Sequence, residues 1–361
     1  MRMRSVLFWG RFDPEYSRNR VIRDLLRKAG CVIYDFIPKL SLFGDLEATL
    51  RGVKRPDVVW VPCFRQRDVA AAARWARRKG IPLVFDPLIS SYNKRTFERR
   101  LFAENSPKAK RLLSEERALF AKADVVIADT ESHKAFYNEV LKVPENRLSV
   151  VYVGADAEFT AAAPNKRETA APLNVLFYGS FMPLHGASTI IEAARLTQGE
   201  PVRWTLLGAG PQKPACVLSA KGLDNVVFED PIPFASLCER IKSADVVLGV
   251  FGDTAQASRV MPNKFFQSLA VGRPVVTRES LAYPVIVAES PAVTFVPPAD
   301  ARALANAICG FARDAGRLEA ATRAARQLYD AEFSAKVILC QLLKAIALCD
   351  TKSRHGVPLG T

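Results

Sequence analysis

Residues Arg259–Thr277 read RVMPNKFFQSLAVGRPVVT and combine the signals of a helix with those of a following strand. Pro262 can occupy the first turn of a helix, where its missing N–H has no intrahelical partner. Apolar residues then recur at helical spacing until Gly272, which can end the helix. The β-branched run Val275–Thr277 predicts a short buried strand. The stretch therefore predicts a loop, a helix, a tight turn and a strand.

The polar residues of this stretch gather near the predicted start of the helix. Arg259, Asn263 and Lys264 all lie there, where free backbone N–H groups and the helix dipole favour an anion. A nucleotide diphosphate would suit such a position. A helix cap that only contacts solvent explains the same residues equally well, so both interpretations remain open on this stretch alone.

Strands alternate with helices along the whole chain, which predicts parallel sheets in an α/β fold. In such sheets ligands bind beyond the carboxyl ends of the strands, where Gly10 and Asp86 are expected. The predicted strands are Ser5–Trp9, Cys31–Phe36, Asp57–Val61, Ile81–Phe85, Ala123–Ala128, Leu148–Val153, Asn174–Tyr178, Arg203–Leu207, Asn225–Phe228, Asp245–Val250, Val275–Thr277 and Val293–Phe295.

An aperiodic segment rich in Ala, Pro and charge, Thr160–Pro172, predicts a linker between two domains. We therefore expect a first domain over residues 1–165 and a second domain over residues 166–333. A last helix and tail, residues 334–361, could pack back on the first domain. Two doubly wound Rossmann-like domains facing a cleft are the predicted architecture.

Composition limits the class of protein. No apolar run reaches the length of a membrane-spanning helix, and the apolar stretch near the start is too short for a signal peptide. Seven cysteines without a Cys-x-x-Cys pair, and three scattered histidines, argue against a disulfide framework or a metal centre. We expect a cytoplasmic protein that needs no metal.

The positive charge is concentrated in the first half. Residues 1–170 carry 32 Lys and Arg against 21 Asp and Glu, which is +11 of the total net charge of +14. Such an asymmetry suits an anionic partner: a phosphorylated lipid head group, an anionic membrane surface or nucleic acid. No nucleic-acid-binding motif supports the last of these.

Glycines follow the first strand of the second half in a way that suits phosphate binding. Gly179 and Ser180 come directly after the strand, and His185 precedes the next helix, whose positive end would point at the same place. An ordinary turn explains the same glycine. The dinucleotide fingerprint, the P-loop and the Gly-x-Ser-x-Gly elbow are all absent, which disfavours dehydrogenases, P-loop ATPases and α/β-hydrolases.

Taken together, these segments resemble the family 4 glycosyltransferases, retaining enzymes of the two-domain GT-B type. The resemblance covers nearly the whole chain. The segments that carry it are Val153–Asp156, Gly179–Gly186, Leu206–Pro211, Ala244–Leu248, and Asn263–Gln267 with Gly272–Val276. It implies transfer of a sugar, with retention, from a nucleotide-diphosphate sugar to a lipid-linked or polysaccharide acceptor at the inner face of a membrane. It also implies that the N-terminal domain, residues 1–165, binds the acceptor and that the domain over residues 166–333 binds the nucleotide sugar.

The chain departs from the family at a pair of glutamates that hold the donor's ribose and sugar. Gln267 and Arg259 stand at those positions. Glutamine can still bond ribose hydroxyls, whereas arginine reverses the charge. The alternative is therefore a non-catalytic relative that binds a sugar nucleotide or a partner enzyme.

The resemblance implies roles for particular residues. Arg259 and Lys264 would stabilise the leaving diphosphate, and Asp86 would orient the sugar or the acceptor, although a turn cap explains Asp86 as well. The donor-binding set is Gly179, Ser180, His185, Gly208, Asn263 and Gln267, and the acceptor-binding set is Gly10, Arg18 and Asn19. His133 is expected on a helix surface. The basic and apolar stretch Phe97–Ala121 could lie on an anionic bilayer or be an ordinary amphipathic helix.

Overall fold

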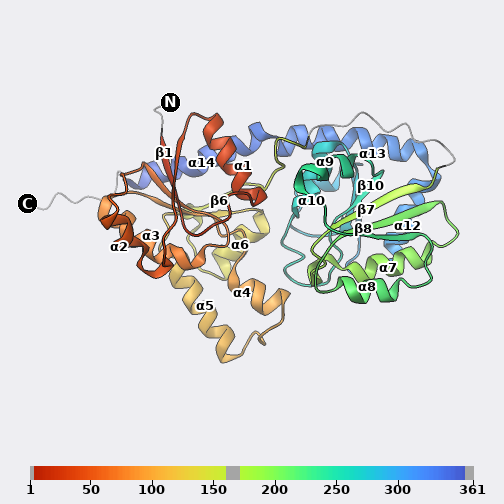
Figure 1. Ribbon diagram of the computed structural model, residues 1–361, viewed down its shortest axis with the longest axis horizontal. Helices are drawn as coiled ribbons and strands as arrows, with labels where there is room; N and C mark the ends of the chain where they lie inside the picture. The colour runs from red at the N-terminus through yellow and green to blue at the C-terminus, as the bar shows by residue number, and fades with distance from the viewer. Residues whose placement is uncertain (1–3, 160–170, 354–361) are drawn as a thin grey trace, which may run out of the picture. The chain divides into compact units, whose positions relative to one another are not determined.

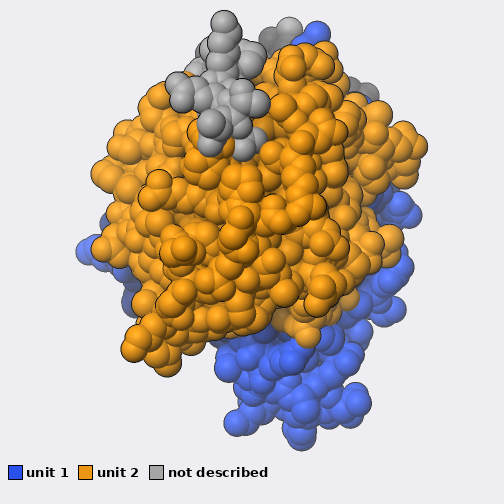
Figure 2. All heavy atoms as spheres, turned by 90° about the vertical axis from the view of Figure 1, so that its right-hand side faces the viewer, with its two compact units in different colours: residues 1–153, 335–361 blue, residues 154–334 orange. Residues whose placement is uncertain are grey.

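A computed structural model describes residues 4–159 and 171–353 of the chain. The chain divides into unit 1, residues 1–153 and 335–361, and unit 2, residues 154–334 (Figure 2). The first unit ends before the predicted boundary at 165, and that boundary, with most of the predicted linker, falls outside the described residues.

Unit 1 is built on a six-stranded parallel sheet in the order β2-β1-β3-β4-β5-β6 (Figure 1). Its strands are β1 (Ser5–Trp9), β2 (Val32–Phe36), β3 (Val58–Val61), β4 (Leu83–Phe85), β5 (Val125–Ala128) and β6 (Leu148–Val150). Its helices are α1 (Ser17–Lys28), α2 (Gly44–Leu50), α3 (Gln66–Lys79), α4 (Ser91–Asn93), α5 (Pro107–Phe120), α6 (Glu131–Glu139) and α14 (Ala335–Ser353), with the short turns η1 (Ser41–Phe43), η2 (Lys94–Glu98) and η3 (Glu145–Arg147).

The inner strands β1, β3, β4 and β5 are buried on both faces of the sheet, which explains their apolar sequences. Successive residues of a strand point to opposite faces. Accordingly Leu7 and Trp9 belong to the core under α3, whereas Val6 and Phe8 belong to the core under α1. Helix α14 adds Ile338, Leu342, Ala345 and Ile346 to the second of these cores. The C-terminal helix therefore contributes to the core of unit 1.

Unit 2 repeats this plan with a sheet in the order β12-β11-β10-β7-β8-β9. Its strands are β7 (Leu173–Gly179), β8 (Val202–Gly208), β9 (Val226–Glu229), β10 (Val246–Leu248), β11 (Val275–Arg278) and β12 (Val293–Val296). Its helices are α7 (Ala187–Leu196), α8 (Lys213–Ser219), α9 (Phe234–Lys242), α10 (Asn263–Val271), α11 (Val285–Ala288), α12 (Ala301–Arg313) and α13 (Ala315–Leu328), with the turns η4 (Pro183–His185) and η5 (Tyr329–Phe333).

Helices cover both faces of this sheet as well: Figure 1 shows α7, α8 and α12 on one side of it and α9 and α10 on the other. The helix predicted after Pro262 is α10, and Gly272 ends it in the left-handed conformation, with φ of 82°. The strand predicted at Val275 is β11. The predicted class, α/β with two doubly wound Rossmann-like domains, is confirmed.

Candidate functional site

The carboxyl ends of β7 and β8 form a backbone surface that only glycine permits. Gly179 pairs with Gly208, and their φ angles of 154° and 131° lie in a region that side chains disfavour. A Cβ atom on Gly208 would lie 2.0 Å from the Gly179 carbonyl oxygen. One on Gly210 would lie 1.7 Å from the Ser180 carbonyl oxygen. The two strand ends therefore approach so closely that backbone groups, without side chains, face the space beyond them.

Two predicted site residues, His185 of the donor-binding set and Lys264 of the catalytic set, converge on Gly179. A Cβ atom there would lie 3.0 Å from Cε1 of His185 and 3.3 Å from Nζ of Lys264. His185 comes from η4, directly after β7, and Lys264 comes from the first turn of α10. The structure thus gathers a glycine backbone, a helix start and a cation at one point.

Lys264 has no charge partner. Its side chain is 5% exposed, and its ammonium makes no hydrogen bond within the described residues. The Nζ atom lies 4.0 Å from the centroid of the Phe177 ring, which offers the face that cations prefer. Burial lowers the pKa of Lys264 well below its ordinary value. An anion bound beside it would supply the missing countercharge.

His185 is held neutral. Burial first, and then the neighbouring charge of Lys264, lower the pKa of its imidazole to about 2. The Met182 backbone N–H donates to Nδ1 at 3.3 Å, which assigns the proton of the neutral ring to Nε2. The ring also packs edge-on against Phe177, with centroids 5.5 Å apart. Its Nε2–H is therefore free to act as a neutral donor.

The other predicted donor residues surround this point in different ways. Gln267 is buried, and its Oε1 accepts a hydrogen bond of 2.9 Å from the Tyr178 hydroxyl. Asn263 is half-buried at the start of α10, and Ser180 is exposed. Tyr178 and Phe177, which the sequence analysis did not assign to the site, belong to it as the partners of Gln267 and Lys264.

Arg259 lies in the loop before α10 and is half-buried. Its guanidinium donates to the Ala255 carbonyl at 3.1 Å, and burial lowers its pKa. This hydrogen bond holds the side chain within its own loop. A role of Arg259 at a diphosphate stays a prediction.

In unit 1, the predicted residues Arg18 and Asp86 bind one another. Nε of Arg18 lies 3.1 and 3.0 Å from the two carboxylate oxygens, and both side chains are fully buried. The guanidinium also donates to the carbonyl of Val151 at 2.9 Å. This arrangement ties α1 to the carboxyl ends of β4 and β6, so it has a structural role whatever either residue does toward a substrate.

The two remaining residues of the predicted acceptor set are also engaged internally. Asn19 donates to the Asp13 carbonyl at 2.7 Å and accepts from the Cys63 thiol at 3.2 Å. Gly10 has a φ of 135°, and a Cβ atom on it would lie 2.9 Å from an Asp68 carboxylate oxygen. The contacts of these residues show how the loop after β1 is fixed and leave acceptor binding a prediction.

The expectation for His133 is wrong, because its side chain is completely buried. Its Nδ1 lies 2.5 Å from an oxygen of Asp129, at the end of β5, and its Nε2 has no partner within the described residues. The signal for a buried histidine was the aspartate four residues earlier, at a strand end. That spacing places the two side chains on the same side of the first turn of α6.

Within residues 4–159 and 171–353, no group of three or more His, Cys, Asp and Glu side chains is arranged to hold a metal ion. The search of the same residues for a helix that is long and apolar enough to cross a membrane also finds none.

Two family models match the chain. The model described as Glycosyl transferase 4-like domain matches residues 36–154, and the one described as Glycosyl transferases group 1 matches residues 172–314.

Curated relatives share just over a quarter of the aligned residues. A protein of Escherichia coli strain K12 named as the colanic acid biosynthesis glycosyltransferase WcaL is 28% identical over 217 residues, which are 56% of this chain and 52% of that protein. D-inositol 3-phosphate glycosyltransferase of Corynebacterium efficiens is 29% identical over 206 residues, which are 52% of this chain and 47% of that protein. The chain thus matches about half the length of each relative.

Solved structures match over almost the whole chain. Sucrose-phosphate synthase of Thermosynechococcus elongatus has a TM-score of 0.76 at 17% identity, covering 97% of this chain and 100% of that one. HepE of Anabaena in complex with UDP-glucose has a TM-score of 0.70 at 15% identity, covering 95% of this chain and 99% of that one. At these identities the likeness concerns the fold.

Proposed function

This chain belongs to the group 1 glycosyltransferases with the GT-B fold, and from that premise we propose that it transfers a sugar from a nucleotide-diphosphate sugar to an acceptor with retention of configuration. The observation that carries this proposal is the convergence of Gly179, His185 and the unpartnered Lys264. UDP and UDP-glucose are bound by structural neighbours of this chain, which supports a donor of the same class.

Such a site acts by stabilising charge. When the bond between the sugar's anomeric carbon and the diphosphate breaks, negative charge develops on the leaving oxygen. The Lys264 ammonium, the Nε2–H of His185 and the backbone around Gly179 lie where they would stabilise that charge. The oxygen of the acceptor hydroxyl bonds to the anomeric carbon of the sugar, and the leaving diphosphate takes the proton of that hydroxyl. No step needs a metal ion, so activity should survive a chelator.

The acceptor is proposed to be a lipid-linked or polysaccharide intermediate that is met at the cytoplasmic face of a membrane. One relative is named for colanic acid biosynthesis, and another is named for an acceptor that carries a phosphate. The first name fits a polysaccharide acceptor, and the second fits an acceptor that bears a phosphate.

A contact with the membrane is best supported in a segment that the sequence analysis did not choose. Most apolar residues of the predicted stretch, among them Phe97, Leu112 and Leu113, pack against the core of unit 1, and Leu101 is exposed. By contrast, residues 37–50 expose a series of large apolar side chains: Ile37, Leu40, Leu42, Phe43, Leu46 and Leu50. The exposed Lys39 lies within this series, and the exposed Arg51, which pairs with Glu47 at 2.9 Å, follows it directly. We propose that this apolar segment, residues 37–50, rests on an anionic bilayer.

Incubation of the full chain with a panel of nucleotide-diphosphate sugars tests the proposed activity, with release of the nucleotide as the signal. One donor should be hydrolysed slowly in the absence of an acceptor and faster with a membrane extract. A folded protein that neither binds nor hydrolyses any member of the panel would overturn the proposal. Addition of a chelator should leave the rate unchanged, and a complete loss that magnesium restores would contradict the metal-free step.

The second candidate function is binding without catalysis, which Gln267 and Arg259 favour because they replace the family's two glutamates. Oε1 of Gln267 is already occupied by the Tyr178 hydroxyl. Nucleotide binding without turnover, unaffected by Arg259→Ala, would support this candidate.

A further inference from the structure

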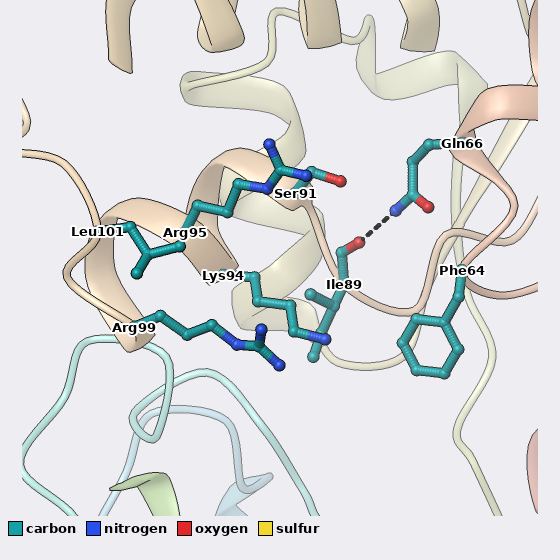
Figure 3. Close-up of a pocket in the computed structure, with 8 residues that line it drawn as sticks. All are labelled: Phe64, Gln66, Ile89, Ser91, Lys94, Arg95, Arg99 and Leu101. Atoms are coloured by element: carbon teal, nitrogen blue, oxygen red, sulfur yellow. Dashed lines mark hydrogen bonds between the residues drawn. The ribbon is translucent and has the colours of Figure 1, made fainter. Parts of the chain in front are cut away.

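Unit 1 contains a pocket of about 370 Å³ beside the segment that follows β4. Its lining comes from the loop between β3 and α3 and from the segment 89–101, and the residues are Phe64, Gln66, Ile89, Ser91, Lys94, Arg95, Arg99 and Leu101. None of the eight is acidic and three are cations (Figure 3).

Two buried carboxylates outside the lining act on the three cations of the pocket: Glu98 on Lys94 and Arg99, and Glu116 on Arg95. Within the part of the chain that the structure describes, none of them takes part in a salt bridge. Burial and the nearby charge of Arg99 lower the pKa of Lys94. Glu98 lies in the same turn, but it is buried, outside the lining, and burial raises the pKa of its carboxyl. Three cations against two carboxylates, neither of which lines the pocket, leave an excess of positive charge there that a bound anion would compensate.

An apolar wall faces these cations. Phe64 has a φ of 62°, in the left-handed region that a phenylalanine rarely adopts, and its ring stays 42% exposed. The Lys94 ammonium lies 5.6 Å from the centroid of this ring. In Figure 3, Lys94 and Arg99 extend from one turn of the chain toward the side where Ile89 and Phe64 lie. Strained backbone that keeps an aromatic ring at a pocket is typical of binding sites.

Hydrogen bonds to Glu116 and Gln66 hold the segment 89–101, which carries the cations, in place. The buried carboxylate of Glu116, on α5, accepts hydrogen bonds from the Ser90 hydroxyl at 2.5 Å and from the backbone N–H groups of Ser91 at 2.6 Å and Tyr92 at 2.8 Å. On the opposite side, Gln66 donates to the Ile89 carbonyl at 2.8 Å. The turn η2 that bears Lys94 and Arg95 is a π-helix, a form that is frequent at functional sites. The pocket is preorganised.

We propose that this pocket binds a phosphate group that is attached to an apolar group, with Lys94 and Arg99 on the phosphate and Phe64 and Ile89 on its apolar neighbour. A guanidinium group such as that of Arg99 binds phosphate through paired hydrogen bonds. The identification of this ligand as the acceptor rests on the proposed function, and it makes the acceptor a phosphate ester. The binding itself requires no nucleotide sugar.

Titration calorimetry of the full chain with n-decyl phosphate, below its micelle concentration, tests this site directly. The wild type should bind it, and the double variant Lys94→Gln with Arg99→Gln should bind at least about tenfold more weakly, because two charge-assisted hydrogen bonds are lost. The variant Arg77→Gln with Lys79→Gln is the matched control. It removes the same charge from the far end of α3, about 20 Å from Gln66 at 1.5 Å per residue.

Titrations with inorganic phosphate and with decyl maltoside separate the contribution of the phosphate group from that of the alkyl chain. Tighter binding of decyl phosphate than of either probe supports a phosphate ester, and equal binding of inorganic phosphate supports a free phosphate in the same pocket. Equal affinity of the pocket variant and the control variant, or equal affinity for decyl maltoside, would overturn the proposal. The single variant Arg99→Gln, at an exposed side chain, keeps the test valid if the double variant is unstable.

Binding of nucleoside diphosphates by the same variants separates this inference from the proposed function. It should be unchanged by the substitutions in unit 1. If no nucleotide binds to any form while decyl phosphate binding still depends on Lys94 and Arg99, the transferase proposal fails and the pocket stands.

Discussion

At the scale of single residues, Lys264 has the most unusual environment in unit 2. A buried ammonium without a partner costs several kcal/mol of desolvation. The ring of Phe177, 4.0 Å away, returns about 2 kcal/mol. The remainder is a cost to the folded protein that a bound anion would offset.

The variant Lys264→Met should therefore make the protein more stable while it weakens the site. We expect the free energy of unfolding to rise by about 1–3 kcal/mol, as measured by urea denaturation at neutral pH. Lys221→Met, at an exposed lysine of the same unit, is the control and should change it by less than about 0.5 kcal/mol. A destabilised Lys264→Met protein would mean that the ammonium is compensated in a way that the described contacts do not reveal.

His185 should contribute to the pH dependence of stability. Its pKa is about 2 in the folded protein but about 6.5 in an unfolded chain. The unfolded state therefore binds more protons below about pH 6.5, so stability is lost as the pH falls from there. Urea denaturation from pH 7 to about 4.5 should show a shallower loss for His185→Gln than for the wild type. Parallel curves would show that His185 takes up a proton while the protein stays folded.

Asp86 is expected to matter first for stability. Asp86→Asn would leave the fully buried Arg18 without its countercharge, which typically costs about 3–5 kcal/mol. Urea denaturation measures this loss, and Arg18→Met combined with Asp86→Leu should recover much of it. If Asp86→Asn keeps wild-type stability and loses only turnover, the residue acts in catalysis and the structural role is wrong.

The residues of the site differ in how far sequence could predict them. The convergence of Gly179 with Lys264 follows from local rules, since each lies at a strand end or helix start and such ends meet at one edge of a parallel sheet. The pairing of Arg18 with Asp86 joins residues 68 positions apart, and only the packed sheet decides it. The burial of His133 was missed although Asp129, four residues earlier at a strand end, gave a local signal for it.

At the scale of elements, the alternation of strands and helices was sufficient to predict both sheets. Every predicted strand is present, with ends that differ by a few residues: Cys31–Phe36 is Val32–Phe36, and Asp245–Val250 is the shorter Val246–Leu248. The sequence analysis treats the stretch Phe97–Ala121 as one continuous basic and apolar surface. The structure separates η2 from α5 there, because Pro107 and the Ser106 cap start a new helix.

The apolar segment, residues 37–50, tests the proposed membrane contact. Leu42→Gln combined with Leu46→Gln removes two exposed leucines and should reduce binding to phosphatidylglycerol vesicles at least about tenfold in a sedimentation assay. Leu218→Gln with Leu281→Gln, at exposed leucines of unit 2, is the matched control. Wild-type protein that does not sediment with these vesicles, or equal loss in both variants, would contradict the contact.

At the scale of the whole molecule, the central claim is that unit 2 binds a nucleotide diphosphate against the Gly179 backbone and Lys264. The doubly wound class of the fold supports this claim, because ligands of such sheets bind beyond the carboxyl ends of the strands. The identities of base, sugar and acceptor depend on side chains outside the recurring segments, so the class alone does not give them.

Titration calorimetry of the full chain with UDP, GDP, ADP, CDP and TDP measures this claim most directly. One nucleotide should bind the wild type, and Gly179→Ala and Lys264→Met should each weaken it at least about tenfold. Gly222→Ala also places an alanine at a positive φ, of 85°, with open space around its new methyl group, and should bind as the wild type does, as should Lys221→Met. If none of the five nucleotides binds, or if Gly179→Ala and Lys264→Met bind as tightly as their controls, the diphosphate site is not where we place it.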